Sequence, residues 1–142
     1  MTSFVYRKKE DITELVIHYS ASDNALHSDI SVIRDWHVIN RNFLDVAYHF
    51  FIPYSGSIQV GRPELAQGAG VKGYNKHTIH ICVHGKTDFK PVQFIMLKSL
   101  VERLCEDYPI TKALYHRDVD GGKCPNFELE WLKEFNEAIQ ST

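Results

Sequence analysis

The stretch Tyr115-His116-Arg117-Asp118-Val119-Asp120-Gly121-Gly122-Lys123-Cys124-Pro125 lies late in the chain and gathers groups that can bind a metal. His116 stands where a strand-like run ends, a glycine-rich turn follows, and Cys124 is fixed by the proline after it. Imidazole and thiolate are ligands that zinc prefers, but a catalytic zinc site uses three protein ligands and keeps one position for water. We therefore expect a third ligand from elsewhere in the chain.

The best candidate for this third ligand is His18, which ends the apolar run Leu15-Val16-Ile17. Residues 12–19 predict a buried strand, and residues 111–115 predict another. If these strands are parallel neighbours, His18 and the later histidine emerge at the same edge of the sheet, where open α/β sheets place their sites. Such a His, His, Cys set suits hydrolysis of an amide, because a zinc ion polarises a carbonyl as a Lewis acid.

A rival set of metal ligands lies on a single strand. Thr78 to His84 alternates between apolar side chains on one face and His80, Cys82 and His84 on the other. Histidines two residues apart can bind a metal, so the residues alone leave this set open. We rank it second because ligands in the middle of a strand lack a loop that opens a coordination position.

Length and composition indicate one compact domain. The chain has 142 residues, 44% of them hydrophobic, which is enough for a core that buries roughly 70% of the unfolded surface. Its three cysteines, Cys82, Cys105 and Cys124, are odd in number and far apart, which argues against a disulfide framework. The formal net charge of -2 predicts no nucleic-acid partner, and no apolar run is long enough for a membrane span or an export leader.

Periodicity predicts the elements of an α/β fold. Ser28 is expected to cap a helix that carries Trp36 and His37. Residues 61–75 contain four glycines and predict a long ordered loop or one short helical turn. Strands are expected at 12–19, 45–52, 57–60, 78–84 and 111–115, and helices at 28–40, 91–107 and 128–139.

Six blocks of sequence follow one another along the chain: Val16-Ile17-His18-Tyr19-Ser20-Ala21, Ile33-Arg34-Asp35-Trp36-His37, Asp45-Val46-Ala47-Tyr48-His49-Phe50, Gly61-Arg62-Pro63-Glu64, Lys72-Gly73-Tyr74-Asn75, and His116-Arg117-Asp118-Val119 with Cys124-Pro125. Together they resemble the zinc-dependent N-acetylmuramoyl-L-alanine amidases, the family of small phage amidase lysozymes and animal peptidoglycan-recognition proteins. The resemblance implies a single domain over residues 1–142, with its core at about 12–140. It also implies a mixed five-stranded sheet flanked by about three α-helices, with zinc in a surface groove.

The resemblance also implies a reaction and its residues. The bond cut would be the amide between N-acetylmuramic acid and the first L-alanine of the stem peptide. His18, His116 and Cys124 match the metal ligands of the family and would bind one zinc ion. Tyr48 matches a tyrosine whose hydroxyl would orient the attacking water or the tetrahedral intermediate, and a phenol is a donor able to stabilise developing charge.

The chain departs from the phage enzymes at two positions. Gly122 stands where they carry a lysine two residues before the cysteine, so either Lys123 supplies that group or zinc and Tyr48 act without it. His80 stands where they carry a small residue, and it would either add a base or a substrate contact near the groove or pack as a core or rim histidine. The other expected substrate contacts are His37, Tyr74 and Asn75.

Two further residues are expected to support the ligands. Asp118 would orient a ligand histidine or form a local ion pair with Arg117. His49 should point away from Tyr48 by strand alternation, and would pack or donate a hydrogen bond behind the site.

The function implied by the resemblance is that of a monomeric phage or prophage lysin, made without a signal peptide and reaching the cell wall after release by a holin-type partner. A toxin delivered by a secretion system fits the same residues. A non-catalytic peptidoglycan-binding module is a second interpretation, which the presence of Cys124 disfavours. A third is a recycling amidase for soluble anhydromuropeptides, whose members usually carry an aspartate at that position. A structural protein with an incidental metal is the last.

Overall fold

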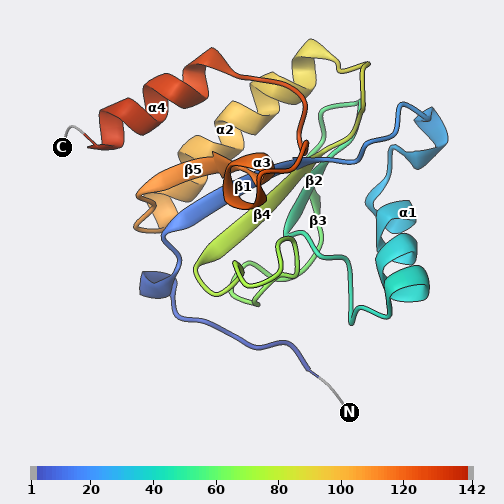
Figure 1. Cartoon of the computed structure of the whole chain (residues 1–142), viewed down its shortest axis with the longest axis horizontal. Helices are drawn as coiled ribbons and strands as arrows, with labels where there is room; N and C mark the ends of the chain where they lie inside the picture. The colour runs from blue at the N-terminus through green and yellow to red at the C-terminus, as the bar shows by residue number, and fades with distance from the viewer. Residues whose placement is uncertain (1–2, 141–142) are drawn as a thin grey trace.

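The computed structural model describes residues 3–140, and its centre is the mixed five-stranded sheet that the sequence predicts (Figure 1). β1 pairs in parallel with two strands, β4 and β5, and β4 pairs in parallel with β2. β3 closes one edge by pairing antiparallel to β2. The strands are β1 (Glu14–Tyr19), β2 (Phe50–Ile52), β3 (Gln59–Val60), β4 (Thr78–Val83) and β5 (Lys112–Tyr115), in the spatial order β3-β2-β4-β1-β5.

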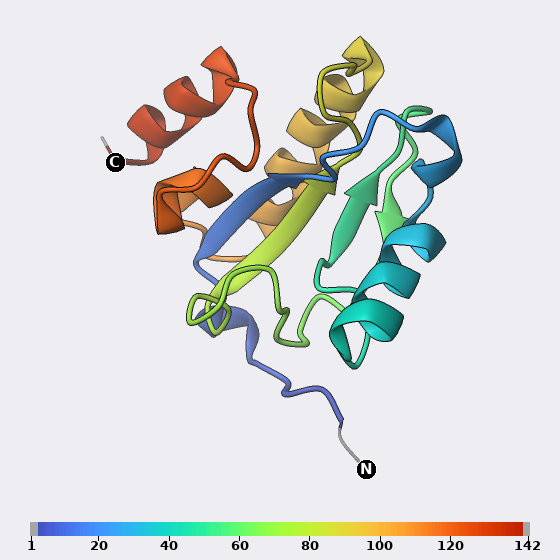
Figure 2. The same cartoon turned by 45° about the vertical axis from the view of Figure 1, so that its right-hand side comes forward.

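Helices cover both faces of the sheet (Figure 2). α2 (Pro91–Asp107) and α4 (Glu130–Gln140) pack on one face, and α1 (Ile30–Asp35) packs on the other. A further short helix, α3 (His116–Asp120), follows β5 directly. Across residues 3–140, every helix is too short or too polar to span a lipid bilayer.

β4 shows the alternation that its sequence predicts. Ile79, Ile81 and Val83 belong to the large core beneath α2, whereas Cys82 packs against α1 in a second, smaller core. All six residues of β4 are buried, because the strand is central and has helices over both of its faces. His80 is buried with them and faces the α1 side, as Cys82 does.

The β2–β3 hairpin is also confirmed, with shorter arms than expected. The expected first arm began at residue 45, but regular pairing with β3 begins only at Phe50. Before Phe50 the arm continues only as two hydrogen bonds, from the Gly61 N–H to the His49 carbonyl (2.8 Å) and from the Arg62 N–H to the Tyr48 carbonyl (3.0 Å). It then turns to other partners: the Ala47 N–H donates to His37 Nδ1 (2.8 Å), and the Ala47 carbonyl accepts from the Ala69 N–H (3.1 Å). In the turn, Gly56 has a φ of 83°, which only glycine adopts without strain.

The start of α1 differs from the expectation. Asp29, not Ser28, is the N-cap, and its Oδ1 accepts from the Ser31 N–H at 2.9 Å. The Ser28 hydroxyl instead accepts from the Tyr54 N–H at 2.8 Å, because the hairpin turn lies beside it. After α1 the chain continues as a π-helical segment, Trp36–Asn40, which places His37 beside the sheet.

α2 is anchored to the sheet by the fully buried side chain of Gln93. Its Nε2 donates to the carbonyls of Ile52 (3.1 Å) and His84 (2.8 Å), at the ends of β2 and β4, and its Oε1 accepts from the Lys90 N–H (2.7 Å). One amide therefore satisfies polar groups of two strands and of the first turn of the helix.

Gln93→Leu is expected to lower the free energy of unfolding by about 2–4 kcal/mol, because buried polar groups lose their partners at similar side-chain volume. Urea denaturation measures this change. Lys98→Leu, at an exposed position of the same helix, is the matched control and should shift stability by less than about 0.5 kcal/mol. Similar losses in the two variants would contradict the anchoring role.

Candidate metal centre

Parallel pairing of β1 and β5 brings two histidines together. Ile17 of β1 lies opposite Tyr115 of β5. His18 and His116 directly follow these two residues, so both emerge at the same edge of the sheet. Their ring centroids are 4.8 Å apart. The sequence predicted this juxtaposition from the apolar run before each histidine.

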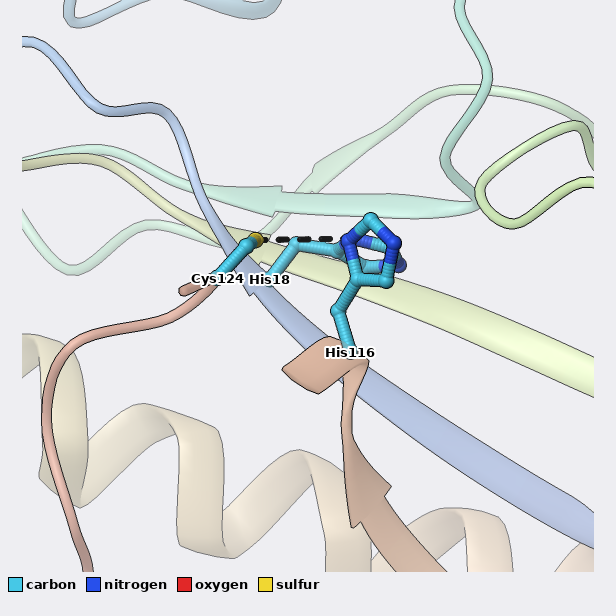
Figure 3. A group of neighbouring side chains, drawn as sticks. All are labelled: His18, His116 and Cys124. Carbon is cyan, nitrogen blue, oxygen red and sulfur yellow. Dashed lines mark hydrogen bonds between the residues drawn. The ribbon is translucent and has the colours of Figure 1, made fainter. Parts of the chain in front are cut away.

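Cys124 returns to the same edge (Figure 3). Its sulfur lies 3.9 Å from His18 Nδ1, and the ligand atoms of His18, His116 and Cys124 all lie within 4.8 Å of one another. Arg117 fixes this return: its N–H donates to the Cys124 carbonyl (2.6 Å), and its guanidinium donates to the carbonyls of Pro125 and Phe127. The loop is thereby tied to α3, which carries His116.

The rival set on β4 is not assembled. Within residues 3–140, His18, His116 and Cys124 form the one group of three or more His, Cys, Asp or Glu side chains arranged to hold a metal. His84 instead donates from Nε2 to the Asn24 carbonyl (3.0 Å), and its Nδ1 lies 2.9 Å from the Ser20 hydroxyl.

The carboxylate beside the ligands is Asp120, and neither role expected of Asp118 is present. Asp118 accepts from the Tyr115 N–H at 2.9 Å and so caps α3, while Arg117 turns to the carbonyls of the following loop. Asp120 lies 2.7 Å from His116 Nε2, because one helical turn separates the two residues. The spacing of four would have revealed this contact, had the sequence indicated a helix after β5.

The hydrogen bonds leave a metal-binding nitrogen free on each histidine. A carboxylate only accepts, so His116 donates from Nε2 to Asp120, and its Nδ1 is buried with no partner in the described chain. His18 Nε2 contacts His80 Nδ1 at 2.9 Å, which leaves His18 Nδ1 facing the sulfur of Cys124. A buried nitrogen without a partner beside an imidazole and a thiol fits a zinc ion, for which two imidazoles and one thiolate are an ordinary donor set.

Burial sets the protonation of the metal-free ligands. It lowers the pKa of His18 well below 6.5, with a smaller contribution from His116. It raises the pKa of the Cys124 thiol to about 11. Since a thiol binds a metal as the thiolate, metal binding at neutral pH is coupled to release of this proton.

A groove runs past the ligands. It consists of two adjoining cavities of about 260 Å³ and about 500 Å³ that share Arg41, Gly70 and His116 in their walls. Cys124 and Tyr48 line the smaller cavity, and His18 lies buried beneath it. The ligand set therefore stands at the floor of a surface groove large enough to admit part of a polymer.

Tyr48 lies beside the ligands as expected from the resemblance. Its ring centroid is 4.7 Å from that of His18, its side chain lines the smaller cavity, and its hydroxyl has no hydrogen-bond partner among residues 3–140. Burial raises the pKa of this phenol well above 10, so the hydroxyl stays protonated at neutral pH. The hydroxyl is therefore a hydrogen-bond donor available to a ligand in the smaller cavity.

Two more residues of the smaller cavity can contact a ligand. His37 Nδ1 accepts from the Ala47 N–H, so its Nε2 carries the proton, and burial lowers its pKa to about 4. Arg41 is exposed, lines both cavities and makes no ion pair within the described chain. Sequence reasoning missed Arg41, because its only signal is its place just after the helical segment that carries His37.

The remaining expected site residues lie at different distances from the ligands. Asn75 lines the larger cavity, and Tyr74 lines a third cavity of about 390 Å³ that shares Gly73 and Asn75 with it. His80 is fully buried behind His18, and Lys123 is exposed and lines neither cavity of the groove. Burial keeps His80 out of direct contact with a ligand in the groove, whereas a substrate contact by Tyr74 and a role for Lys123 stay predictions.

His49 lies behind the site, as expected, and is neutral. Its Nε2 donates to the Ala66 carbonyl (2.7 Å), and its Nδ1 accepts from the His80 N–H (3.0 Å). Burial lowers its pKa from 6.5 to about 3. The folded chain therefore resists a proton that the unfolded chain accepts.

Lowering the pH from about 7.5 to about 5 is expected to reduce the free energy of unfolding of the metal-free protein by about 2 kcal/mol through His49 alone. The folded pKa lies below the unfolded value, so this stability is present above about pH 6.5 and is lost as the pH falls toward 3. Urea denaturation at several pH values measures the slope. His49→Gln should reduce it, whereas His77→Gln, at an exposed histidine, should not. A flat profile would contradict the assignment.

Comparison with known proteins agrees with the fold and identifies the family. The family model described as N-acetylmuramoyl-L-alanine amidase matches residues 8–127, and the chain belongs to this family. It is therefore a peptidoglycan amidase, as its six sequence blocks predicted.

Individual relatives show which members of the amidase family the chain resembles. The endolysin of Escherichia phage T7 is 32% identical over 149 aligned residues, which cover 99% of this chain and 98% of that protein. The solved structure of the N-acetylmuramoyl-L-alanine amidase LysC from Clostridium intestinale matches with a TM-score of 0.77 at 25% identity, over 99% of this chain and 93% of that one. The structure of Drosophila PGRP-LB matches with a TM-score of 0.75 at 25% identity, over 87% and 79%. The chain thus groups with phage endolysins along nearly its whole length.

Proposed function

We propose that this chain is a phage or prophage endolysin, a single amidase domain that binds one zinc ion through His18, His116 and Cys124. It would cleave the amide between N-acetylmuramic acid and the first L-alanine of the stem peptide in peptidoglycan. The observation that carries the proposal is the convergence of two free imidazole nitrogens and one sulfur at the floor of an open groove. The full-length similarity to phage endolysins supports the biological role.

The three ligands would hold the ion from one side, which leaves a position for water or substrate. When bound, zinc would polarise the scissile carbonyl and lower the pKa of a water molecule toward about 7. His18 and His116 would present their Nδ1 atoms to the ion, and Cys124 would contribute one negative charge as the thiolate. That charge makes the centre less positive than a set of three histidines.

Tyr48 would donate its hydroxyl hydrogen bond to the oxyanion that forms when water adds to the amide carbon. Removing one such donor typically costs about 100-fold to 1000-fold in rate. The proton needed by the leaving alanine nitrogen would come from Tyr48 or from water, and Lys123 would act only if its side chain extended into the groove.

Two groove residues would hold the substrate. His37 presents a neutral Nε2–H donor suited to a carbonyl of the lactyl group or the stem peptide. Arg41 supplies a positive charge suited to a stem carboxylate. Asn75 lines the larger cavity, beyond the ligands.

Mass spectrometry of digested cell-wall sacculi tests the bond cleaved. The expected products are stem peptides with a free L-alanine amino group and glycan strands whose muramic acids carry a free lactyl carboxyl. A chelator should abolish their release, and added Zn²⁺ should restore it. Products cut between sugars or within the stem peptide would overturn the proposal, as would full activity after zinc is stripped.

The cellular route is part of the same proposal. A monomeric enzyme made in the cytoplasm would reach the wall after a holin-type partner permeabilises the membrane. Lysis timed in cells that express the chain with and without such a partner tests this route. Equal lysis in both would contradict it.

A further inference from the structure

The ring of His18 is held on its Nε2 side by His80, and His80 is held in turn by Asn75. His18 Nε2 lies 2.9 Å from His80 Nδ1, and His80 Nε2 lies 2.7 Å from Asn75 Oδ1. Both histidines are fully buried, so the contact between them is shielded from water. Asn75, His80 and His18 form a continuous hydrogen-bonded chain that leads to the metal ligand.

The direction of this chain is fixed at its far end. Asn75 Oδ1 also accepts from the Val71 N–H at 3.2 Å, so this atom is the amide oxygen and His80 must donate to it from Nε2. The Nδ1 of a neutral His80 then carries a lone pair and accepts from His18 Nε2–H. His18 is left with its Nδ1 lone pair directed to the sulfur of Cys124.

The surrounding backbone is shaped to admit the His80 ring. Val16, two residues before His18 on β1, lies opposite His80 on β4, so the two histidines are diagonal neighbours on one face of the sheet. A Cβ at Gly70 would overlap the His80 ring, and one at Gly68 would lie 3.0 Å from its Cδ2. Glycines at both positions therefore leave the space that the ring occupies.

We propose that His80 and Asn75 are positioning residues for His18: they hold its ring in the one tautomer and orientation that present Nδ1 to the metal. The proposal rests on the proposed metal role of His18. It gives His80 a role inside the protein in place of a substrate contact. Partners of this kind behind a metal ligand typically contribute about 10-fold to 100-fold in metal affinity.

The test combines zinc affinity with the tautomer of His18. His80→Leu keeps a similar side-chain volume and removes both hydrogen bonds, and we expect its zinc affinity, measured by chelator competition, to fall about 10-fold to 100-fold. Asn75→Leu should weaken zinc binding in the same direction, whereas Asn75→Asp keeps the acceptor oxygen and should bind zinc within about threefold of the parent.

The matched control is His84→Leu, a buried histidine on the same face of the sheet that contacts no ligand. This variant also replaces a fully buried imidazole by leucine. An equal fall in zinc affinity in His84→Leu and His80→Leu would therefore show that both variants act through general destabilisation. Circular dichroism and urea denaturation establish that each variant is folded. If His80→Leu does not fold, the Asn75 pair carries the test, because Asn75 lies outside the strands.

The second readout is long-range ¹H–¹⁵N NMR of the metal-free protein, which distinguishes the two ring nitrogens of His18. The parent should show protonation at Nε2 alone, and His80→Leu should show a mixture of tautomers. Unchanged zinc affinity together with an unchanged tautomer would overturn the proposal. Because the NMR measurement needs no metal, a parent that fails to bind zinc would sink the proposed function and still leave the positioning role open to measurement.

Discussion

Cys124→Ser is expected to lose amidase activity by about 100-fold or more and to retain little zinc. The serine hydroxyl stays protonated at neutral pH, so only His18 and His116 remain as ligands. The site also loses the negative charge of the thiolate. The release of L-alanine amino groups from muropeptides measures the activity, and elemental analysis of the purified chain measures the zinc.

Cys105→Ser is the matched control for this change. Cys105 lies on α2, is half-buried against the core and has no contact with the ligand set. The same exchange of sulfur for oxygen there should leave zinc content unchanged and activity within about threefold. A Cys124→Ser variant that cleaves as fast as the parent would exclude Cys124 from the metal site.

Tyr48→Phe is expected to lower kcat by about 100-fold to 1000-fold while zinc content stays near that of the parent. The hydroxyl has no partner within residues 3–140, so its removal leaves no protein group unsatisfied, and the ring keeps its contacts with His18 and His37. The loss should therefore fall on the transition state. Separate measurement of kcat and KM on a soluble muropeptide tests this assignment.

Tyr54→Phe is the control for loss of a tyrosine hydroxyl. Tyr54 lies in the β2–β3 turn, and its hydroxyl donates only a long bond, 3.3 Å, to the Asp23 carbonyl. It should retain activity within about twofold. If Tyr48→Phe loses zinc together with activity, the tyrosine supports the metal site and does not act on the substrate.

The sheet and the ligand set could be predicted because both follow local rules. The apolar runs before His18 and His116 indicate strands that end at the same edge, and the glycine turn brings Cys124 back. Alternation along β4 correctly separated its two faces. Each of these inferences depends on residues that are neighbours in sequence, plus one assumption of parallel pairing.

The supporting residues could not be predicted, because their partners are set by tertiary contacts. Asp120 reaches His116 only because α3 forms after β5, and the glycines that follow indicated a turn. Ser28 lost its expected capping role to Asp29 because the hairpin turn lies against its hydroxyl. The sequence left His80 open between a groove contact and a core position, and its place in a central strand with helices over both faces buries it.

Gly70 and His80 share one ring-sized volume between the loop and the central strand, since any side chain at the first position would collide with the imidazole at the second. The two positions should therefore covary among homologues. A relative with a larger side chain at residue 70 should carry a residue as small as glycine at residue 80. A variant that supports His18 with a side chain from residue 70 would therefore need both Gly70 and His80 substituted together.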